Sequence, residues 1–136
     1  MTIRETCDQV KRMVDRAITW EDDKDTVGLI EHWQSHAPQI LADENYKTLD
    51  DCDGFALTAA ELCVHYGIST SSIRLVFCEI PDLGYHLVCT VDDVEADKTW
   101  VFDNNEERIR DWKRIPYNWL RYMKYENLGH WFQIDD

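Results

Sequence analysis

The feature that most constrains this chain is an apolar stripe that follows a short acidic cluster. In the segment 55–66, apolar residues recur at the spacing of one face of an α-helix. Asp50 or Asp51 is suited to cap the N-terminus of this helix, and Gly67 stands where a glycine commonly ends one. The pattern predicts a helix with one buried face, and it places Cys52 in the first turn.

The first turn of a helix is a special position for a cysteine. Backbone N–H groups there have no partner within the helix, and the positive end of the helix dipole lies close by. Both favour the thiolate, which is the nucleophilic form of cysteine. We therefore expect Cys52 to be an activated nucleophile.

Three segments that follow this helix have the composition of β-strands. Residues 73–80 and 85–91 are rich in apolar and β-branched residues, and 99–103 forms a third short run. A turn separates the first two runs, and an acidic loop separates the second from the third. Because neighbouring strands with short connections usually pair side by side, we expect an antiparallel meander.

The chain of 136 residues is long enough for one domain with a core and too short for two ordinary ones. An amphipathic pattern predicts a first helix over about 2–20. The aromatic-rich tail, 106–136, is expected to pack over the sheet. The predicted fold class is α+β, with N-terminal helices and a central cysteine-bearing helix packed on a small antiparallel sheet, in a single domain of 1–136.

A nucleophilic cysteine needs a base, and the base needs a group that orients it. His65 is on the same helix as Cys52, roughly 20 Å along it, so it is too distant to serve. His86 begins one predicted strand and Asp103 ends the next, and a hairpin between them makes the two direct cross-strand neighbours. A helix packed on that face would bring Cys52 to them and complete a Cys–His–Asp triad.

Other interpretations of the same residues stay open at this point. A histidine on an apolar strand is often a core residue, and a buried cysteine is often inert. A metal site built from Cys52, His86 and Asp103 would need a fourth ligand that the pattern does not provide. The acidic run Glu21–Asp25 is either a solvated loop or a cation site, and 27–33 is either a short helix or irregular.

Composition limits the classes of partner and the compartment. The formal net charge of −13 and the lack of a clustered basic patch exclude a nucleic-acid backbone or an anionic membrane as the expected partner. The 5 cysteines are odd in number and form no C-x-x-C pair, which favours free buried thiols in a reducing compartment. The first residues contain no signal-peptide pattern and no run long enough to span a membrane, so we expect a cytoplasmic location.

Three motifs together resemble the bacterial transglutaminase-like cysteine proteinases, a family of the transglutaminase-core, papain-like group. They are the segments 51–56 (DCDGFA), 84–88 (GYHLV) and 100–104 (WVFDN). The resemblance implies Cys52 as nucleophile, His86 as general acid and base, and Asp103 as the residue that orients the imidazole. It also implies acyl transfer from a protein or peptide amide through a thioester.

The resemblance extends to a possible cofactor and to the setting. Members that release adhesins in the periplasm hold calcium with acidic residues around the cysteine, and Asp51 and Asp53 match those positions. Gly54 departs from the family pattern, because an acid commonly follows there. The absent signal peptide is a second departure, and it implies a cytoplasmic member encoded by a phage or mobile element.

Two further points complete the sequence-based expectations. The backbone N–H of Cys52 is a natural oxyanion donor, and the second donor is expected from Asn45, Tyr46 or Lys47. Two alternatives to a cysteine peptidase remain: a catalytically silent acidic protein of the same fold that binds a basic partner, and a transglutaminase that joins Gln to Lys.

Overall fold

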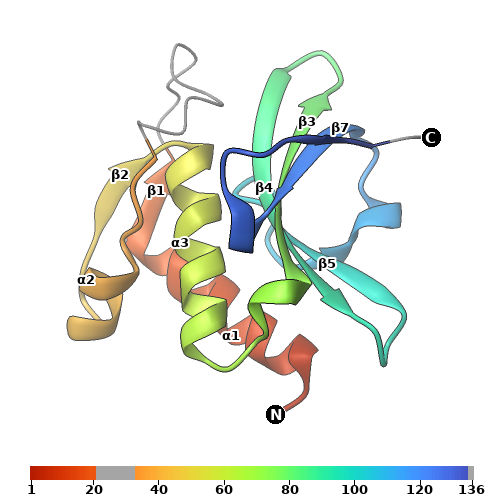
Figure 1. Cartoon of the computed structure of the whole chain (residues 1–136). Helices are drawn as coiled ribbons and strands as arrows, with labels where there is room; N and C mark the ends of the chain where they lie inside the picture. Colours follow the sequence, from red (N-terminus) through yellow and green to blue (C-terminus); the bar gives the residue numbers. More distant parts are fainter. Residues whose placement is uncertain (21–32, 135–136) are drawn as a thin grey trace.

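The computed structural model describes residues 1–20 and 33–134. The acidic run Glu21–Asp25, His32 and most of 27–33 lie outside the described residues. Along the chain, the first helix is followed by a short strand, a second helix and another short strand. The cysteine-bearing helix comes next, and a run of strands completes the chain (Figure 1). The helical and first strand elements are α1 (Ile3–Ala17), β1 (Ile18–Trp20), α2 (Ala37–Ala42), β2 (Thr48–Asp50) and α3 (Cys52–His65).

The later part of the chain forms one six-stranded antiparallel sheet in the order β6-β5-β4-β3-β7-β8. The predicted meander is confirmed, because β3 pairs with β4 and β4 with β5, all antiparallel. The strands are β3 (Ile73–Ile80), β4 (Gly84–Asp93), β5 (Lys98–Phe102), β6 (Arg110–Asp111), β7 (Asn118–Lys124) and β8 (Phe132–Gln133). Short 3-10 turns at Thr70–Ser72, Trp112–Arg114 and Tyr125–Asn127 connect them.

The first helix starts as the sequence suggests but ends earlier than predicted. Thr2 and Glu5 form a reciprocal capping box at its N-terminus. The predicted helix ran to about residue 20, whereas α1 ends at Ala17 and the next three residues pair in parallel with β2. Those residues, Ile18–Trp20, are β-branched or aromatic, so strand pairing overrides their helical periodicity.

The central helix α3 is buried on nearly all sides rather than on one stripe. Besides the predicted apolar positions, its small residues and even Asp53 and Thr58 are buried. Figure 1 shows that α3 has α1 and α2 on one side and the sheet face formed by β3 and β4 on the other. Small side chains let the neighbouring backbones approach closely, and only a narrow side with Glu61 and His65 remains partly exposed. The α+β class with helices on a small antiparallel sheet is thus confirmed.

The aromatic tail was expected to cover the sheet, but part of it becomes the sheet. Strand β7 pairs with β3 along most of its length, so the tail extends the meander on the side away from β5. Trp119 and Tyr122 then pack on the outer face, while Met123 enters the core under the helices. The bulge at Leu120 interrupts the alternation between Trp119 and Tyr122, so both lie on the outer face. Of the described helices, none is both long and apolar enough to cross a membrane.

The substitution Leu75→Ala tests the packing between the sheet and the helices. The Leu75 side chain is 0% exposed on β3, so Leu75→Ala leaves a cavity that rigid neighbours fill only in part. We expect the free energy of unfolding to fall by about 2–5 kcal/mol, measured by urea denaturation. Leu83→Ala is the matched control, because Leu83 is 76% exposed in the β3–β4 turn. Equal losses for both variants would contradict this packing.

Candidate active site

The N-terminus of α3 holds Cys52 as its first residue. Asp51 caps the helix by accepting a hydrogen bond from the backbone N–H of Gly54 at 3.2 Å. The Cys52 side chain is only 4% exposed. Its Sγ donates a hydrogen bond to Asp53 Oδ1 at 3.7 Å, and the backbone N–H of Leu87 in β4 faces the sulfur and lowers the pKa of the thiol. The thiol therefore lies against the strand that carries His86.

The thiol meets β4 at an edge rather than on a face. The β4–β5 ladder ends at the pair Cys89–Phe102, so the N-terminal part of β4 has no partner from β5. That early end leaves the N–H of Leu87 available to the Cys52 sulfur. Leu87 belongs to the core under the helices, whereas His86 contacts Tyr117 near the outer face. The prediction that α3 packs on the face of His86 is therefore wrong, because α3 packs on the face of Leu87 and Cys52 contacts the backbone of the residue next to His86.

His86 and Asp103 meet as predicted, although by a different register. His86 Nε2 lies 2.7 Å from Asp103 Oδ1, and both side chains are buried. Continuing the observed register places Asp103 opposite Val88, two residues along β4 from His86. The two are therefore diagonal rather than direct neighbours, and the length of the imidazole side chain closes the gap.

Asp103 is a buried carboxylate with several donors. Tyr117 donates its hydroxyl proton to Oδ2 at 2.6 Å, and the backbone N–H of Asn105 donates to Oδ1 at 2.9 Å. Burial alone would raise the pKa of Asp103, but the hydrogen bond and charge of His86, with the donors Tyr117 and Asn105, hold it below its usual value. Asp103 is thus ionised at neutral pH and fixed in orientation.

The electrostatic environment of Cys52 differs from the sequence-based expectation. Burial raises the pKa of the Cys52 thiol, and the negative charges of Asp53 and Asp51 raise it further. The N–H of Leu87 opposes this rise but does not outweigh it. The expectation of a thiolate stabilised by the helix N-terminus is therefore wrong, because the same acidic residues that suit a helix start disfavour a second negative charge.

A second histidine–carboxylate pair lies just before α3. His36 Nε2 is 2.6 Å from Asp50 Oδ2, and His36 Nδ1 is 3.0 Å from the hydroxyl of Tyr46. Asp50 occupies the space next to Gly54, where an added Cβ would meet Asp50 Oδ2 at 1.9 Å. Glycine at position 54 is thus required by the close approach of Asp50, which explains the departure from the family pattern noted above.

Two of the three expected second oxyanion donors are engaged elsewhere. The N–H groups of Tyr46 and Asn45 donate to Asp43, to its carbonyl at 3.0 Å and its carboxylate at 2.9 Å respectively. Lys47 directs its Nζ to the carbonyl of Arg16 at 3.3 Å. The structure therefore speaks against Tyr46 and Asn45 in this role.

Asp51 and Asp53 are the acids that the sequence analysis proposed as calcium ligands. Ca²⁺ takes six to eight oxygen ligands, so these two would need further donors. Residues 1–20 and 33–134 contain no group of three or more His, Cys, Asp or Glu side chains placed to hold a metal ion. Gly54 supplies no side-chain ligand, and the neighbouring Asp50 pairs with His36.

The remaining cysteines and His65 lie where the sequence predicted them. All five cysteines are free and buried, as expected. His65 ends α3 while Cys52 begins it, which keeps them apart. Sequence reasoning missed Tyr117, His36 and the Leu87 N–H. Tyr117 belongs to the tail segment that was assigned only to packing, and a backbone donor leaves no signal in a sequence.

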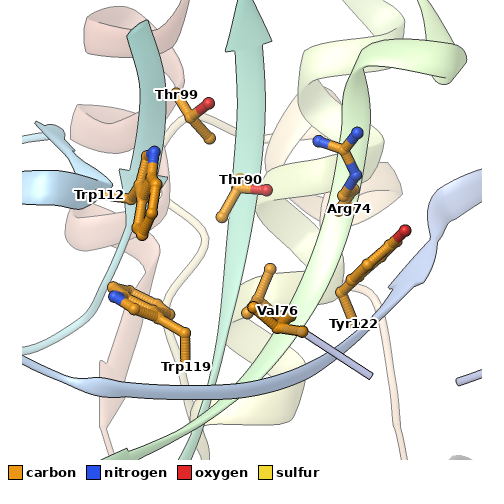
Figure 2. A pocket seen from close by; sticks show the side chains of 8 residues that line it. Arg74, Val76, Thr90, Thr99, Trp112, Trp119 and Tyr122 are labelled. Atoms are coloured by element: carbon orange, nitrogen blue, oxygen red, sulfur yellow. The ribbon is translucent and has the colours of Figure 1, made fainter. Parts of the chain in front are cut away.

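A hollow on the outer face of the sheet is separate from these groups. Its volume is about 220 Å³, and it contains neither Cys52, His86 nor Asp103. Figure 2 shows two tryptophans on one side of it, with an arginine and a tyrosine on the other. The lining residues are Arg74, Val76, Thr90, Thr99, Trp112, Trp119, Tyr122 and Ile134. This hollow carries none of the proposed chemistry.

Comparisons with known proteins agree with the observed fold. A family model described as bacterial transglutaminase-like cysteine proteinase matches residues 2–136. Among solved structures, calcium-bound LapG from Legionella pneumophila superposes with a TM-score of 0.73 at 16% identity, covering 96% of this chain and 68% of LapG. EGTA-treated LapG gives a TM-score of 0.73 at 15% identity, covering 98% and 68%. The search of curated protein sequences returns no match.

Tyr117→Phe tests the hydrogen bond that supports Asp103. Removing the hydroxyl takes a donor from a buried carboxylate, so we expect the free energy of unfolding at pH 7 to fall by about 1.5–3 kcal/mol. Because the pKa of Asp103 is lowered in the folded protein, its contribution is present above roughly pH 4 and is lost as the pH falls further. The difference between wild type and variant should therefore shrink in acid.

Denaturant titrations at several pH values measure this difference. Tyr85→Phe is the control, because the Tyr85 side chain is 63% exposed. A Tyr117→Phe effect that is independent of pH, or no larger than that of Tyr85→Phe, would contradict the assigned role.

Proposed function

The chain belongs to the bacterial transglutaminase-like cysteine proteinase family, and we propose that it hydrolyses peptide bonds through a thioester on Cys52. The observation that carries this proposal is the His86–Asp103 pair, whose Nε2 and Oδ1 atoms are 2.7 Å apart. His86 directly precedes Leu87, whose backbone N–H binds the Cys52 sulfur. A nucleophile, a base and an orienting carboxylate are the groups that acyl transfer needs.

The proposed acylation step begins with a neutral thiol. Because the pKa of Cys52 is raised, the proton must pass to a base as the sulfur attacks, and Nδ1 of His86 is the nitrogen not taken by Asp103. The sulfur bonds to the carbonyl carbon of the substrate. The protonated imidazole then gives its proton to the leaving amine as the C–N bond breaks, and the thioester remains.

Deacylation reverses the roles of the same groups. Water attacks the thioester carbonyl while His86 takes one of its protons. The C–S bond breaks, the proton returns to the sulfur, and the product leaves as a carboxylic acid. The backbone N–H of Cys52 is the proposed donor to the oxyanion in both steps, since it lies at the helix start.

Asp103 and Tyr117 serve the base rather than the substrate. The ionised carboxylate holds the imidazole by Nε2 and stabilises the cation that forms during each step. Tyr117 fixes the second carboxylate oxygen, so Asp103 cannot rotate away. We assign both as positioning residues.

Selective labelling tests the nucleophile. Cys52 is the only one of the five cysteines with measurable exposure, at 4%, while the other four are 0% exposed. We expect iodoacetamide at pH 7.5 to modify the folded protein at one site, found by mass spectrometry. Cys52→Ala should abolish the labelling and His86→Ala should slow it, while Cys78→Ala should leave it unchanged. Labelling that is no faster at Cys52 than at the other thiols would contradict the proposal.

Peptide cleavage tests the reaction itself. With a synthetic peptide library and mass spectrometry, Cys52→Ala should be inactive and His86→Ala should lose about 10²–10⁴-fold in rate, the range for a general base. Incorporation of a labelled amine at glutamine in place of hydrolysis would instead identify a transglutaminase. Binding of basic proteins without any turnover would identify the acidic interaction protein.

The proposed mechanism uses no calcium, and the described residues contain no group of three or more His, Cys, Asp or Glu side chains placed to hold a metal ion. LapG is known in calcium-bound and EGTA-treated forms, so the ion is the natural ligand to try. We expect the melting temperature to change by no more than about 1 °C, a shift well under 1 kcal/mol, between millimolar Ca²⁺ and EGTA. A calcium-dependent rise that Asp53→Asn removes, but Asp97→Asn keeps, would show that further ligands join Asp53.

A further inference from the structure

Arg121 lies in line with the proposed nucleophile across three strands. Its partner in β3 is Phe77, and the partner of Phe77 in β4 is Leu87, whose N–H binds the Cys52 sulfur. Phe77 and Leu87 both belong to the core beneath the helices, so this row runs along the inner face. The β3–β7 register shifts just beside Arg121, where Leu120 is left without a partner. Bulges of this kind redirect side chains and are frequent beside active sites.

The guanidinium of Arg121 is held by aromatic rings and by no carboxylate. Its central carbon is 4.8 Å from the ring centroid of Phe77 and 4.6 Å from that of Trp131. Within the described residues it forms no ion pair, although the chain carries a net charge of −13. Its Nε is buried and has no acceptor there. Such a group has unused hydrogen-bonding capacity in its plane.

The chemistry of this arrangement favours a carboxylate. Rings against the faces of a guanidinium leave its N–H groups pointing outward in the plane, where they match the two oxygens of a carboxylate. The aromatic contacts also fix the side chain in advance, which lowers the cost of binding. The neighbouring Tyr85 stacks on Phe77 with 63% of its side chain exposed, so the row reaches solvent at this end.

The spacing matches a peptide bound to Cys52. Adjacent strands are about 4.8 Å apart, so the row from Leu87 to Arg121 spans roughly 10 Å. An extended peptide covers about 3.3 Å per residue. The distance from the cleaved bond to a substrate residue within three positions is therefore comparable to the distance between these two strand positions.

We propose that Arg121 is a specificity residue that binds a carboxylate of the peptide substrate within about three residues of the cleaved bond. The carboxylate is either an Asp or Glu side chain or the C-terminus of the peptide. The proposal rests on the proposed function, since it assumes that the substrate is a peptide bound at Cys52.

The first test compares defined peptides. A sequence that the enzyme cleaves is made with Glu or Gln at each position within three residues of the bond, and with a free or an amidated C-terminus. At one position, or at the terminus, wild type should prefer the charged form by about tenfold in kcat/KM, the scale of one hydrogen bond to a charged group. The position that responds identifies which source of carboxylate is bound.

Variants assign this preference to Arg121. In Arg121→Gln the ratio between charged and neutral peptides should fall to near one, and in Arg121→Lys it should be intermediate, because lysine keeps the charge without the planar fork. Arg110→Gln is the matched control on the opposite edge of the sheet, and it should keep the wild-type ratio. Thermal unfolding shows which variants are folded, and Arg121→Lys carries the test if Arg121→Gln is not. An unchanged ratio in the folded variant would overturn the proposal.

Binding to an inactive protein separates this proposal from the proposed function. The Glu and Gln peptides, or free and amidated ones, are titrated into Cys52→Ala with and without Arg121→Gln by fluorescence anisotropy. A preference for the charged peptide of about tenfold that Arg121→Gln removes supports the carboxylate site even if the wild type cleaves nothing. Equal binding of charged and neutral peptides overturns the carboxylate site, even if cleavage at Cys52 is observed.

Discussion

The early end of the β4–β5 ladder is the constraint on which the site depends. Had the pairing continued past Cys89 and Phe102, the N–H of Leu87 would have been taken by β5 and the Cys52 sulfur would have had no place at the strand edge. The same ending frees Asp103 from the ladder, so that its side chain can bond to His86. One missing stretch of strand pairing thus leaves room both for the helix terminus at Leu87 and for the bond between His86 and Asp103.

The surroundings of Asp103 stabilise its negative charge, whereas those of Cys52 disfavour one. Asp103 has donors for both of its oxygens, and its pKa is lowered despite burial. Cys52 has the opposite balance, because burial and the neighbouring Asp53 outweigh the single N–H that favours its thiolate. With its pKa raised, Cys52 needs a base to take its proton in the proposed mechanism, and His86 is the residue proposed for that role. The hydrogen bond to Asp103 fixes the orientation of the His86 imidazole.

The tail of the chain contributes to the site from both faces of the sheet. Tyr117 precedes β7 and supports Asp103 near the outer face, while Arg121 lies on the inner face in line with Leu87. The bulge at Leu120 separates the two and changes the alternation between them. The segment from Tyr117 through β7, which adds a strand to the predicted meander, therefore contains both the proposed positioning residue and the proposed contact to substrate.

The sequence by itself determined the local elements and the pairing of His86 with Asp103. The cap at Asp51, the buried helix after Cys52, the meander and the partnership of His86 with Asp103 were all predictable, because each depends on spacing along one element or across one hairpin. The tertiary structure decided the rest. The pKa of Cys52, the diagonal register, the end of α1 at Ala17, the His36–Asp50 pair that requires Gly54, and the entry of β7 into the sheet depend on burial and on contacts between distant segments. Such contacts leave no periodic pattern in the sequence, since they arise only when separate elements pack together.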